Sequence, residues 1–270
     1  MSKAPSTAVL YVSHLVTAGT LWNYMQLRRA LGQECSLYWV CQGNSARRRL
    51  APLPIETFPV TDELLSTWRP AMNGNGLVPG NCHIPAVAFA RQNPHEHYWF
   101  VEYDVRYTGS WNTVFEMGRP SDADLIAAFV ESPFRDSTWY HWETVDLPYA
   151  DVARSFNPIC RASHRLLEEV TKVITGDHWA HNEALLASAC RHHGWPMADL
   201  NDLARAHREA PLYTPVPDEH ATGTLSYRPA QPTVWGAERQ RLHHPVKPLR
   251  WFQKKFGPYD GIKEALNRWR

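Results

Sequence analysis

The stretch AVLYVSHLVTAGTLWNYMQLRRALGQECSLYWVC, residues 8–41, decides the fold class. Its two ends, Ala8–Ser13 and Ser36–Cys41, are short and apolar, which is typical of buried strands in a parallel sheet. Between them, Thr20–Leu31 carries apolar side chains at helical spacing, and Gly32 stands where such a helix would end. Strand, helix and strand in this order predict a βαβ unit. We therefore expect an α/β fold, with helices on a mostly parallel central sheet and a Rossmann-like N-terminal half.

The same spacing rules predict the elements that follow. Three further strands are expected, at Ile55–Val60, within His97–Tyr107 and at Ser137–Val145. Helices are expected at Thr61–Trp68, Ile84–Arg91, Ser121–Val130, Ser163–Ile174 and Asn182–His193. Prolines then interrupt every periodicity, so we interpret Ala210–Leu242 as a long irregular segment of the kind that forms lids.

The composition argues against several classes of protein. Lys plus Arg number 28 and Asp plus Glu number 27, so no global basic field exists and no nucleic-acid partner is expected. No apolar run is long enough for a spanning helix, and the first residues lack the apolar segment of a signal peptide. The five cysteines are scattered and odd in number, which favours reduced thiols and a cytoplasmic location.

Two acidic residues follow the apolar run Tyr98–Val101. Glu102 and Asp104 are two residues apart, so an extended chain would place both on one side. In an open α/β sheet, ligands bind at the carboxyl edge of the strands. Two carboxylates there suit Mg²⁺ or Mn²⁺, which would offset the charge of a departing diphosphate. The alternative interpretation is an ordinary solvated strand end.

A second candidate cluster is HHPVK, His243–Lys247, late in the irregular segment. An imidazole is a suitable further ligand for Mn²⁺, and a lysine supplies a point charge for phosphate. The sequence does not decide between His243 and His244 as the ligand. A pair of surface histidines in a turn is the alternative.

A third candidate is Glu183, at the start of the expected helix Asn182–His193. Its carboxylate could draw a proton from an attacking hydroxyl group. An acid in the first turn of a helix is also favoured by the helix dipole alone, so this residue type has a second explanation.

Taken in order, these pieces resemble a glycosyltransferase of the GT-A fold, of the polysaccharide-biosynthesis type. The resemblance rests on YWFVEYDVRYTGSW (Tyr98–Trp111), which contains a Glu-Tyr-Asp variant of the Asp-x-Asp motif. Phe156–Ser163 resembles an acceptor-side segment, and His181–Leu186 resembles a Glu-bearing helix start. His244–Lys247 is similar to the C-terminal metal-ligand segment of such enzymes.

The resemblance implies a nucleotide-sugar donor, a saccharide or lipid-linked saccharide acceptor, and Mn²⁺ or Mg²⁺. The implied metal ligands are Asp104, Glu102 and His244. The implied donor contacts are Glu102, Lys247 and Ser13. The implied acceptor contacts are Trp111, Arg161 and His181. Glu183 would be the catalytic base if the enzyme inverts the anomeric centre; in a retaining enzyme it would only hold the acceptor.

The expected organisation is one catalytic domain over residues 1–270. Residues 8–110 would bind the nucleotide sugar, 111–205 the acceptor, and 206–248 would form the lid and supply a metal ligand. The basic, aromatic tail 249–270 would either contact the inner face of a membrane or pack on the domain. The expected function is sugar transfer in surface polysaccharide biosynthesis. The alternatives are a Mg²⁺-dependent nucleotidyl or phosphoryl transferase and a non-catalytic carbohydrate-binding protein.

Overall fold

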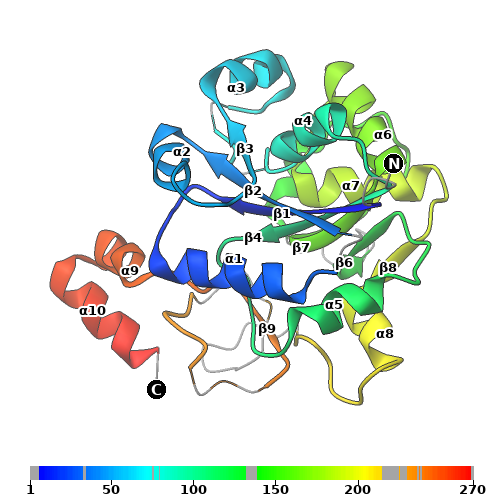
Figure 1. Ribbon diagram of the computed structural model, residues 1–270. Coiled ribbons are helices and arrows are strands. Elements are labelled where there is room, and N and C mark those ends of the chain that lie inside the picture. The colour runs from blue at the N-terminus through cyan, green and yellow to red at the C-terminus, as the bar shows by residue number, and fades with distance from the viewer. Residues whose placement is uncertain are drawn as a thin grey trace.

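The computed structural model describes residues 6–32, 35–74, 76–78, 80–131, 139–214, 225, 230–235, 237 and 239–268. Its centre is a seven-stranded sheet in the order β3-β2-β1-β4-β7-β6-β8 (Figure 1). The strands are β1 (Thr7–Ser13), β2 (Cys35–Gln42), β3 (Thr57–Val60), β4 (His97–Glu102), β6 (Leu125–Glu131), β7 (Arg154–Ser163) and β8 (Met197–Asp199). All neighbouring pairs are parallel except the two that involve β7. The predicted fold class is therefore confirmed.

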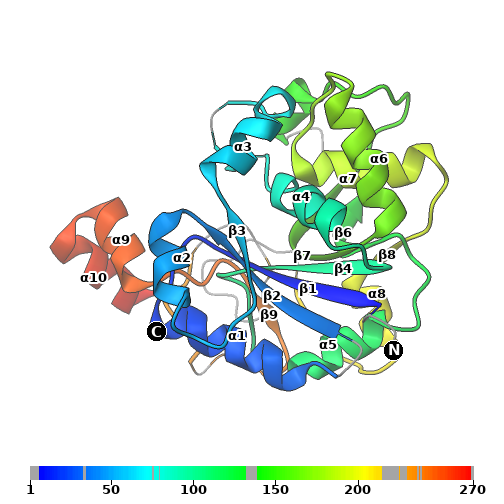
Figure 2. The ribbon, with the colours of Figure 1, turned by 45° about the horizontal axis from the view of Figure 1, so that its top comes forward.

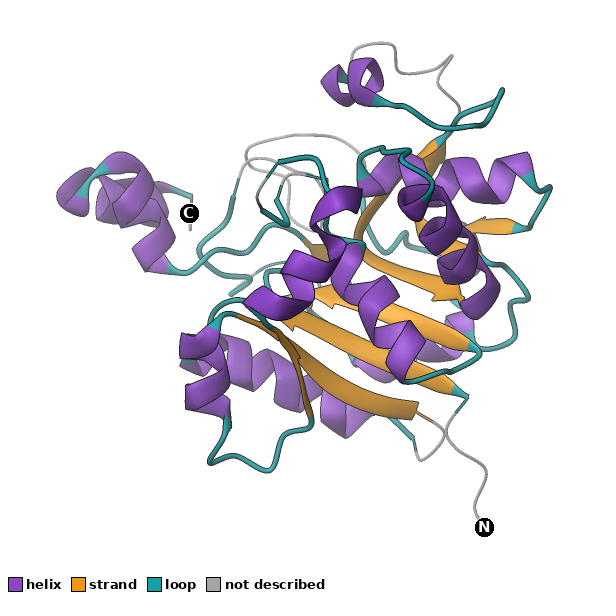
Figure 3. Cartoon of the chain, turned by 90° about the horizontal axis from the view of Figure 1, so that it is seen from above, coloured by secondary structure: helices purple, strands orange, loops and turns teal. Residues whose placement is uncertain are grey.

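Helices cover both faces of the sheet (Figures 2 and 3). On one face lie α3 (Asp62–Trp68), α4 (Ile84–Gln92), α6 (His164–Thr175) and α7 (Asn182–His192). On the other face lie α1 (Ala18–Ala30), α2 (Asn44–Leu50), α5 (Trp111–Gly118) and α8 (Leu200–Arg205). Strand β1 supplies both cores in alternation: Ala8 and Leu10 belong to the first, Val9 and Tyr11 to the second.

The order of the strands creates a topological switch point beside β1. The chain moves from β1 through α1 to β2 and on to β3, and it then returns to β4 on the other side of β1. At such a switch point the connections leave in opposite directions, and the carboxyl ends of the two strands border a binding crevice. Here those ends are Ser13 on β1 and Glu102 on β4.

The late chain returns to this same edge. The short strands β5 (Arg106–Tyr107) and β9 (Leu242–His243) form an antiparallel pair directly after the turn that follows β4. The last two helices, α9 (Leu249–Phe256) and α10 (Pro258–Asn267), pack against each other as a hairpin beside the main body (Figure 1). No helix among the described residues is both long and apolar enough to cross a membrane.

Two of the predicted elements are wrong. The expected helix Ser121–Val130 is instead the strand β6, because its apolar run pairs with β7 and β8 inside the sheet. Asp124 does not serve a helix terminus there, since it accepts hydrogen bonds from Ser163 and Arg165. Of the expected strand Ser137–Val145, the described part is a short 3₁₀ helix, Tyr140–Thr144. Part of the expected lid, including 215–224 and 226–229, lies outside the described residues.

Candidate metal and donor site

Backbone hydrogen bonds bring the end of β4 and the late chain together. Val246 N donates to Asp104 O at 2.8 Å, and Tyr103 N donates to Val12 O at 3.0 Å. The first bond fixes the segment after β9 against Asp104, and the second fixes the turn after β4 against β1. The residue after β9, His244, therefore reaches the carboxyl edge of the sheet.

Three side chains converge there with the chemistry of a divalent metal site. His244 Nε2 lies 3.4 Å from Glu102 Oε2 and 3.7 Å from Asp104 Oδ2. One ligand atom from each of the three lies within 4.8 Å of the others. Within the described residues, Asp104 Oδ1 has no hydrogen-bond partner although it is buried. Together with the second carboxylate and the imidazole, this buried oxygen forms a donor set that fits Mn²⁺ or Mg²⁺.

Lys247 closes this cluster from one side. Its ammonium forms an ion pair with Asp104 Oδ2, and it donates to Tyr103 Oη at 3.0 Å. Burial opposes ionisation of Asp104, but the neighbouring His244 and Lys247 outweigh it and hold the pKa of this carboxyl below its usual value. Burial likewise lowers the pKa of Lys247, and the Asp104 carboxylate reverses this and raises it. The pair is thus ionised.

Sequence reasoning missed His14, the residue after β1. Its ring meets the ring of Tyr103 edge-on, with 5.0 Å between centroids. Burial lowers the pKa of His14, and the nearby ammonium of Lys247 lowers it further. The sequence signal that could have pointed to His14 is its place directly after the predicted strand Ala8–Ser13. The adjacent Ser13 is buried, and its hydroxyl bonds with the backbone of Leu15 in a local turn.

Glu183 lies in the first turn of α7 on the same edge of the molecule. Burial raises its pKa to about 8; Arg154 acts against this shift and Glu102 adds to it. Cys82, which sequence reasoning also missed, links the two groups. Burial raises the pKa of its thiol, and Glu102, Glu183 and Asp104 raise it further, so all three carboxyl groups act on one sulfur.

His181 caps α7, since its Nδ1 accepts from Glu183 N at 3.3 Å. Its ring stacks on His141 at 4.2 Å and meets Trp139 edge-on at 5.5 Å. Burial lowers the pKa of His181 to about 3, so the ring is neutral. Arg154 lies over the Trp139 ring at 5.4 Å. Trp139, His141 and His181 therefore form an aromatic wall at the N-terminus of α7, the helix that carries Glu183 in its first turn.

The other two predicted acceptor residues have structural roles. Trp111 is 2% exposed and packs between Tyr107 and Phe115 in the core. Arg161, in the middle of β7, donates to the carbonyl oxygens of Gly118, Ser121 and Ala123 at 2.5–2.8 Å. These contacts leave neither side chain available to an acceptor, so Trp111 and Arg161 are not part of the proposed site.

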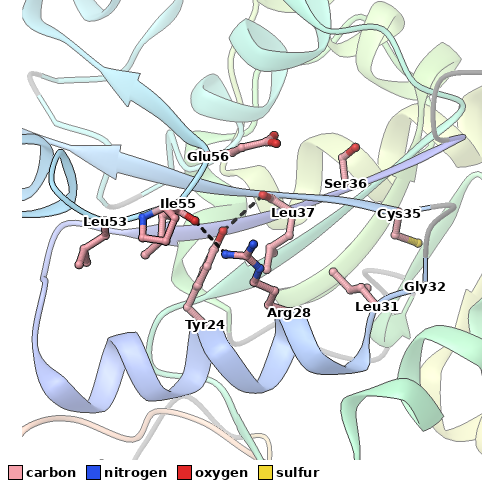
Figure 4. A pocket seen from close by; sticks show the side chains of 11 residues that line it. Tyr24, Arg28, Leu31, Gly32, Cys35, Ser36, Leu37, Leu53, Ile55 and Glu56 are labelled. Atoms are coloured by element: carbon pink, nitrogen blue, oxygen red, sulfur yellow. Dashed lines mark hydrogen bonds between the residues drawn. The ribbon is translucent and has the colours of Figure 1, made fainter.

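A separate cavity of about 530 Å³ lies at the opposite edge of the sheet. It is lined by the C-terminal half of α1, the start of β2 and the segment before β3 (Figure 4). Arg28 there donates to Pro54 O, and Tyr24 donates to Leu37 O. The cavity therefore borders the amino ends of the strands, away from the Glu102–Asp104–His244 cluster.

No protein-family model matches the sequence, and no curated protein matches it. Among solved structures, a mannosyltransferase from Pyrobaculum calidifontis in complex with GDP-Man and Mn²⁺ matches at 10% identity with a TM-score of 0.43. The match covers 73% of this chain and 55% of the mannosyltransferase, so this chain spans only about half of that protein.

Two further solved structures match over more of their length. Glucosyl-3-phosphoglycerate synthase from Mycobacterium tuberculosis, in complex with UDP, matches at 14% identity and a TM-score of 0.41, over 77% of this chain and 74% of the other. A putative glucose-1-phosphate thymidylyltransferase from Bacillus anthracis matches at 7% identity and a TM-score of 0.44, over 76% and 97%. Similarities below a TM-score of 0.5 do not assign a family or an activity.

Proposed function

We propose that the chain is a metal-dependent glycosyltransferase of the GT-A type. It transfers a sugar from a nucleotide-sugar donor to a hydroxyl group of a saccharide or glycolipid acceptor, in surface polysaccharide biosynthesis. One observation carries the proposal: Glu102, Asp104 and His244 converge at the switch point of the sheet, with Lys247 beside them. Parallel α/β sheets bind nucleotides at this place.

The residues around the switch point have separate roles in sugar transfer. A cation held by Glu102, Asp104 and His244 would supply positive charge for the diphosphate leaving group. Lys247 adds a second positive charge on the same side. Burial raises the pKa of Glu183 to about 8, so above that pH its carboxylate can accept a proton from an acceptor hydroxyl. The wall of Trp139, His141 and His181 offers flat faces for a sugar ring.

The position of Glu183 favours sugar transfer over the nucleotidyl or phosphoryl transferase alternative. Phosphoryl transfer depends on positioning and on charge stabilisation, which the cation cluster alone would provide. An acceptor hydroxyl needs a base to remove its proton, and Glu183 follows His181 of the aromatic wall while Glu102 of the metal cluster acts on its pKa. A carbohydrate-binding protein would need neither group.

The test is a thermal-shift panel of nucleoside diphosphates and nucleotide sugars, each with and without Mn²⁺. We expect one nucleotide to raise the melting temperature only with Mn²⁺, because a ligand of the folded state stabilises it by mass action. Asp104→Asn should abolish that shift. Appearance of the sugar on a saccharide or glycolipid acceptor, together with release of the nucleoside diphosphate, then confirms transfer. No shift with any nucleotide would overturn the proposal.

We also propose that the α9–α10 hairpin holds the enzyme on an anionic membrane, where lipid-linked acceptors would lie. Tyr259, Ile262 and Leu266 follow one face of α10 at helical spacing and are 80%, 40% and 50% exposed. The opposite face carries Gly261 and Ala265, both buried, and Gly261 meets the α9 backbone.

The charge of the α9–α10 hairpin also favours an anionic membrane. The exposed cations of the hairpin are Arg250, Lys254, Lys255 and Lys263, against one exposed acid, Asp260. Glu264 is paired with Arg268 at 2.6 Å. An apolar stripe flanked by basic side chains is the pattern of helices that lie in the interface of anionic bilayers.

A further inference from the structure

Lys247 forms its ion pair with the carboxylate of Asp104, which is one of the three candidate metal ligands. Asp104 is the least exposed of the three candidate ligands, at 1% of its side-chain surface. Lys247 contacts its Oδ2, and the same ammonium donates to Tyr103 Oη and lies 4.8 Å from the centre of the Tyr103 ring. The ammonium is therefore held on the ligand oxygen by a second hydrogen bond and by a cation–π contact.

A divalent cation and this ammonium compete for one carboxylate. A cation bound by Glu102, Asp104 and His244 would stand beside a like charge at close range, inside a site of low exposure. Repulsion between charges is strong where water is excluded. Of the two groups, the ammonium is the one on a flexible four-carbon stem, and its side chain keeps 18% exposure. It is the group that moves.

We infer that Lys247 couples metal binding to diphosphate binding. In the metal-free protein it neutralises Asp104. When the cation enters, the ammonium leaves Oδ2 and pairs with the diphosphate of the donor. The inference rests on the proposed donor site. Its consequence is that the cation alone binds weakly, because it must displace the lysine, while cation and diphosphate together bind tightly.

The test compares the wild type with Lys247→Met, which keeps the length of the stem and removes the charge. Titration calorimetry with MnCl₂ alone should give about tenfold tighter binding to Lys247→Met, within the usual range of coupling between sites. UDP and GDP, each added at saturating Mn²⁺, should show about tenfold weaker binding to the same variant for the nucleotide that the wild type accepts. Misfolding would weaken the binding of both ligands, so it cannot explain tighter binding of Mn²⁺ together with weaker binding of the nucleotide.

Two further variants complete the experiment. Lys263→Met removes the same charge from the exposed α10 and should leave both affinities unchanged. Lys247→Arg keeps the charge and should leave Mn²⁺ binding weak. If the wild type and Lys247→Met bind Mn²⁺ equally, or if the variant binds it more weakly, the coupling is overturned while the metal site stands. If neither protein binds Mn²⁺, the metal site and the proposed function fall together.

Discussion

His244 and Glu102 come from distant parts of the chain, yet His244 Nε2 lies 3.4 Å from Glu102 Oε2. The pairing of Arg106 with His243 in the β5–β9 ladder explains this approach, because the next residue along must then lie beside the end of β4. His244, rather than His243, is therefore the histidine that faces the two carboxylates.

The first prediction concerns this histidine. His244→Ala should weaken Mn²⁺ binding by about tenfold to a hundredfold, as loss of a ligand or its support usually does. Calorimetric titration with MnCl₂ measures it. His207→Ala, at an exposed position in the turn after α8, is the matched control and should bind like the wild type. Unchanged Mn²⁺ affinity in His244→Ala would remove His244 from the site.

The second prediction concerns Glu183 and pH. At pH values below its pKa of about 8, the carboxyl group of Glu183 is protonated and cannot accept a proton. Turnover should therefore rise with pH up to about 8 and then become constant. Glu183→Gln should lower kcat by roughly 10² to 10⁴ and remove this dependence. Turnover is measured with the nucleotide sugar that the thermal-shift panel identifies. A variant with wild-type kcat would show that Glu183 is not the base.

A stability measurement checks the same group without turnover. Folding raises the pKa of Glu183 from 4.5 to about 8, so the folded state favours the protonated form. The stabilisation is complete below pH 4.5 and is lost as pH rises through about 8. Glu183→Gln cannot ionise, so its melting temperature relative to the wild type should be higher at pH 9 than at pH 5. An equal difference at both pH values would contradict the raised pKa.

The third prediction follows from the buried guanidinium of Arg161. Arg161→Met removes the guanidinium donor from the carbonyl oxygens of Ser121 and Ala123, and it leaves the carbonyl oxygen of Gly118 with only the backbone N–H of Ser121. The free energy of unfolding should fall by about 2–4 kcal/mol, because unsatisfied buried polar groups are costly. Urea unfolding measures this. Nucleotide affinity at low temperature should be unchanged; a selective loss of acceptor affinity without loss of stability would restore Arg161 to the site.

The N-terminal half could be predicted because its signals are local. The run at Ala8–Ser13, the helix after it and the run at Ser36–Cys41 each have one period and clear ends. The helices expected to begin at Thr61 and Ser163 are also confirmed, with these two residues as their N-caps. The strand β6 could not be predicted, since Ser121, Asp122 and Asp124 form a plausible helix start. Only the pairing of the apolar run with β7 and β8 decides against it.

Part of the candidate site could also be predicted from the sequence, and part of it could not. Glu102 and Asp104 follow directly from a predicted strand, so their place at the carboxyl edge could be foreseen. The choice of His244 over His243 depends on the β5–β9 register. Trp111 is buried because α5 also packs against α1 and α8, and Arg161 is held by carbonyl oxygens far along the chain, which no local pattern reports.

The last prediction concerns the stripe on α10. Replacing Tyr259, Ile262 and Leu266 by serine should reduce binding to vesicles that contain anionic lipid by at least about tenfold, because apolar burial and basic charge act together. Flotation with phosphatidylcholine–phosphatidylglycerol vesicles measures this, and vesicles of phosphatidylcholine alone should bind weakly. The control variant removes the exposed Trp22 and Met25 of α1 and should float like the wild type. If the wild type stays unbound on anionic vesicles, or if the triple variant floats equally well, the hairpin does not hold the enzyme on the membrane.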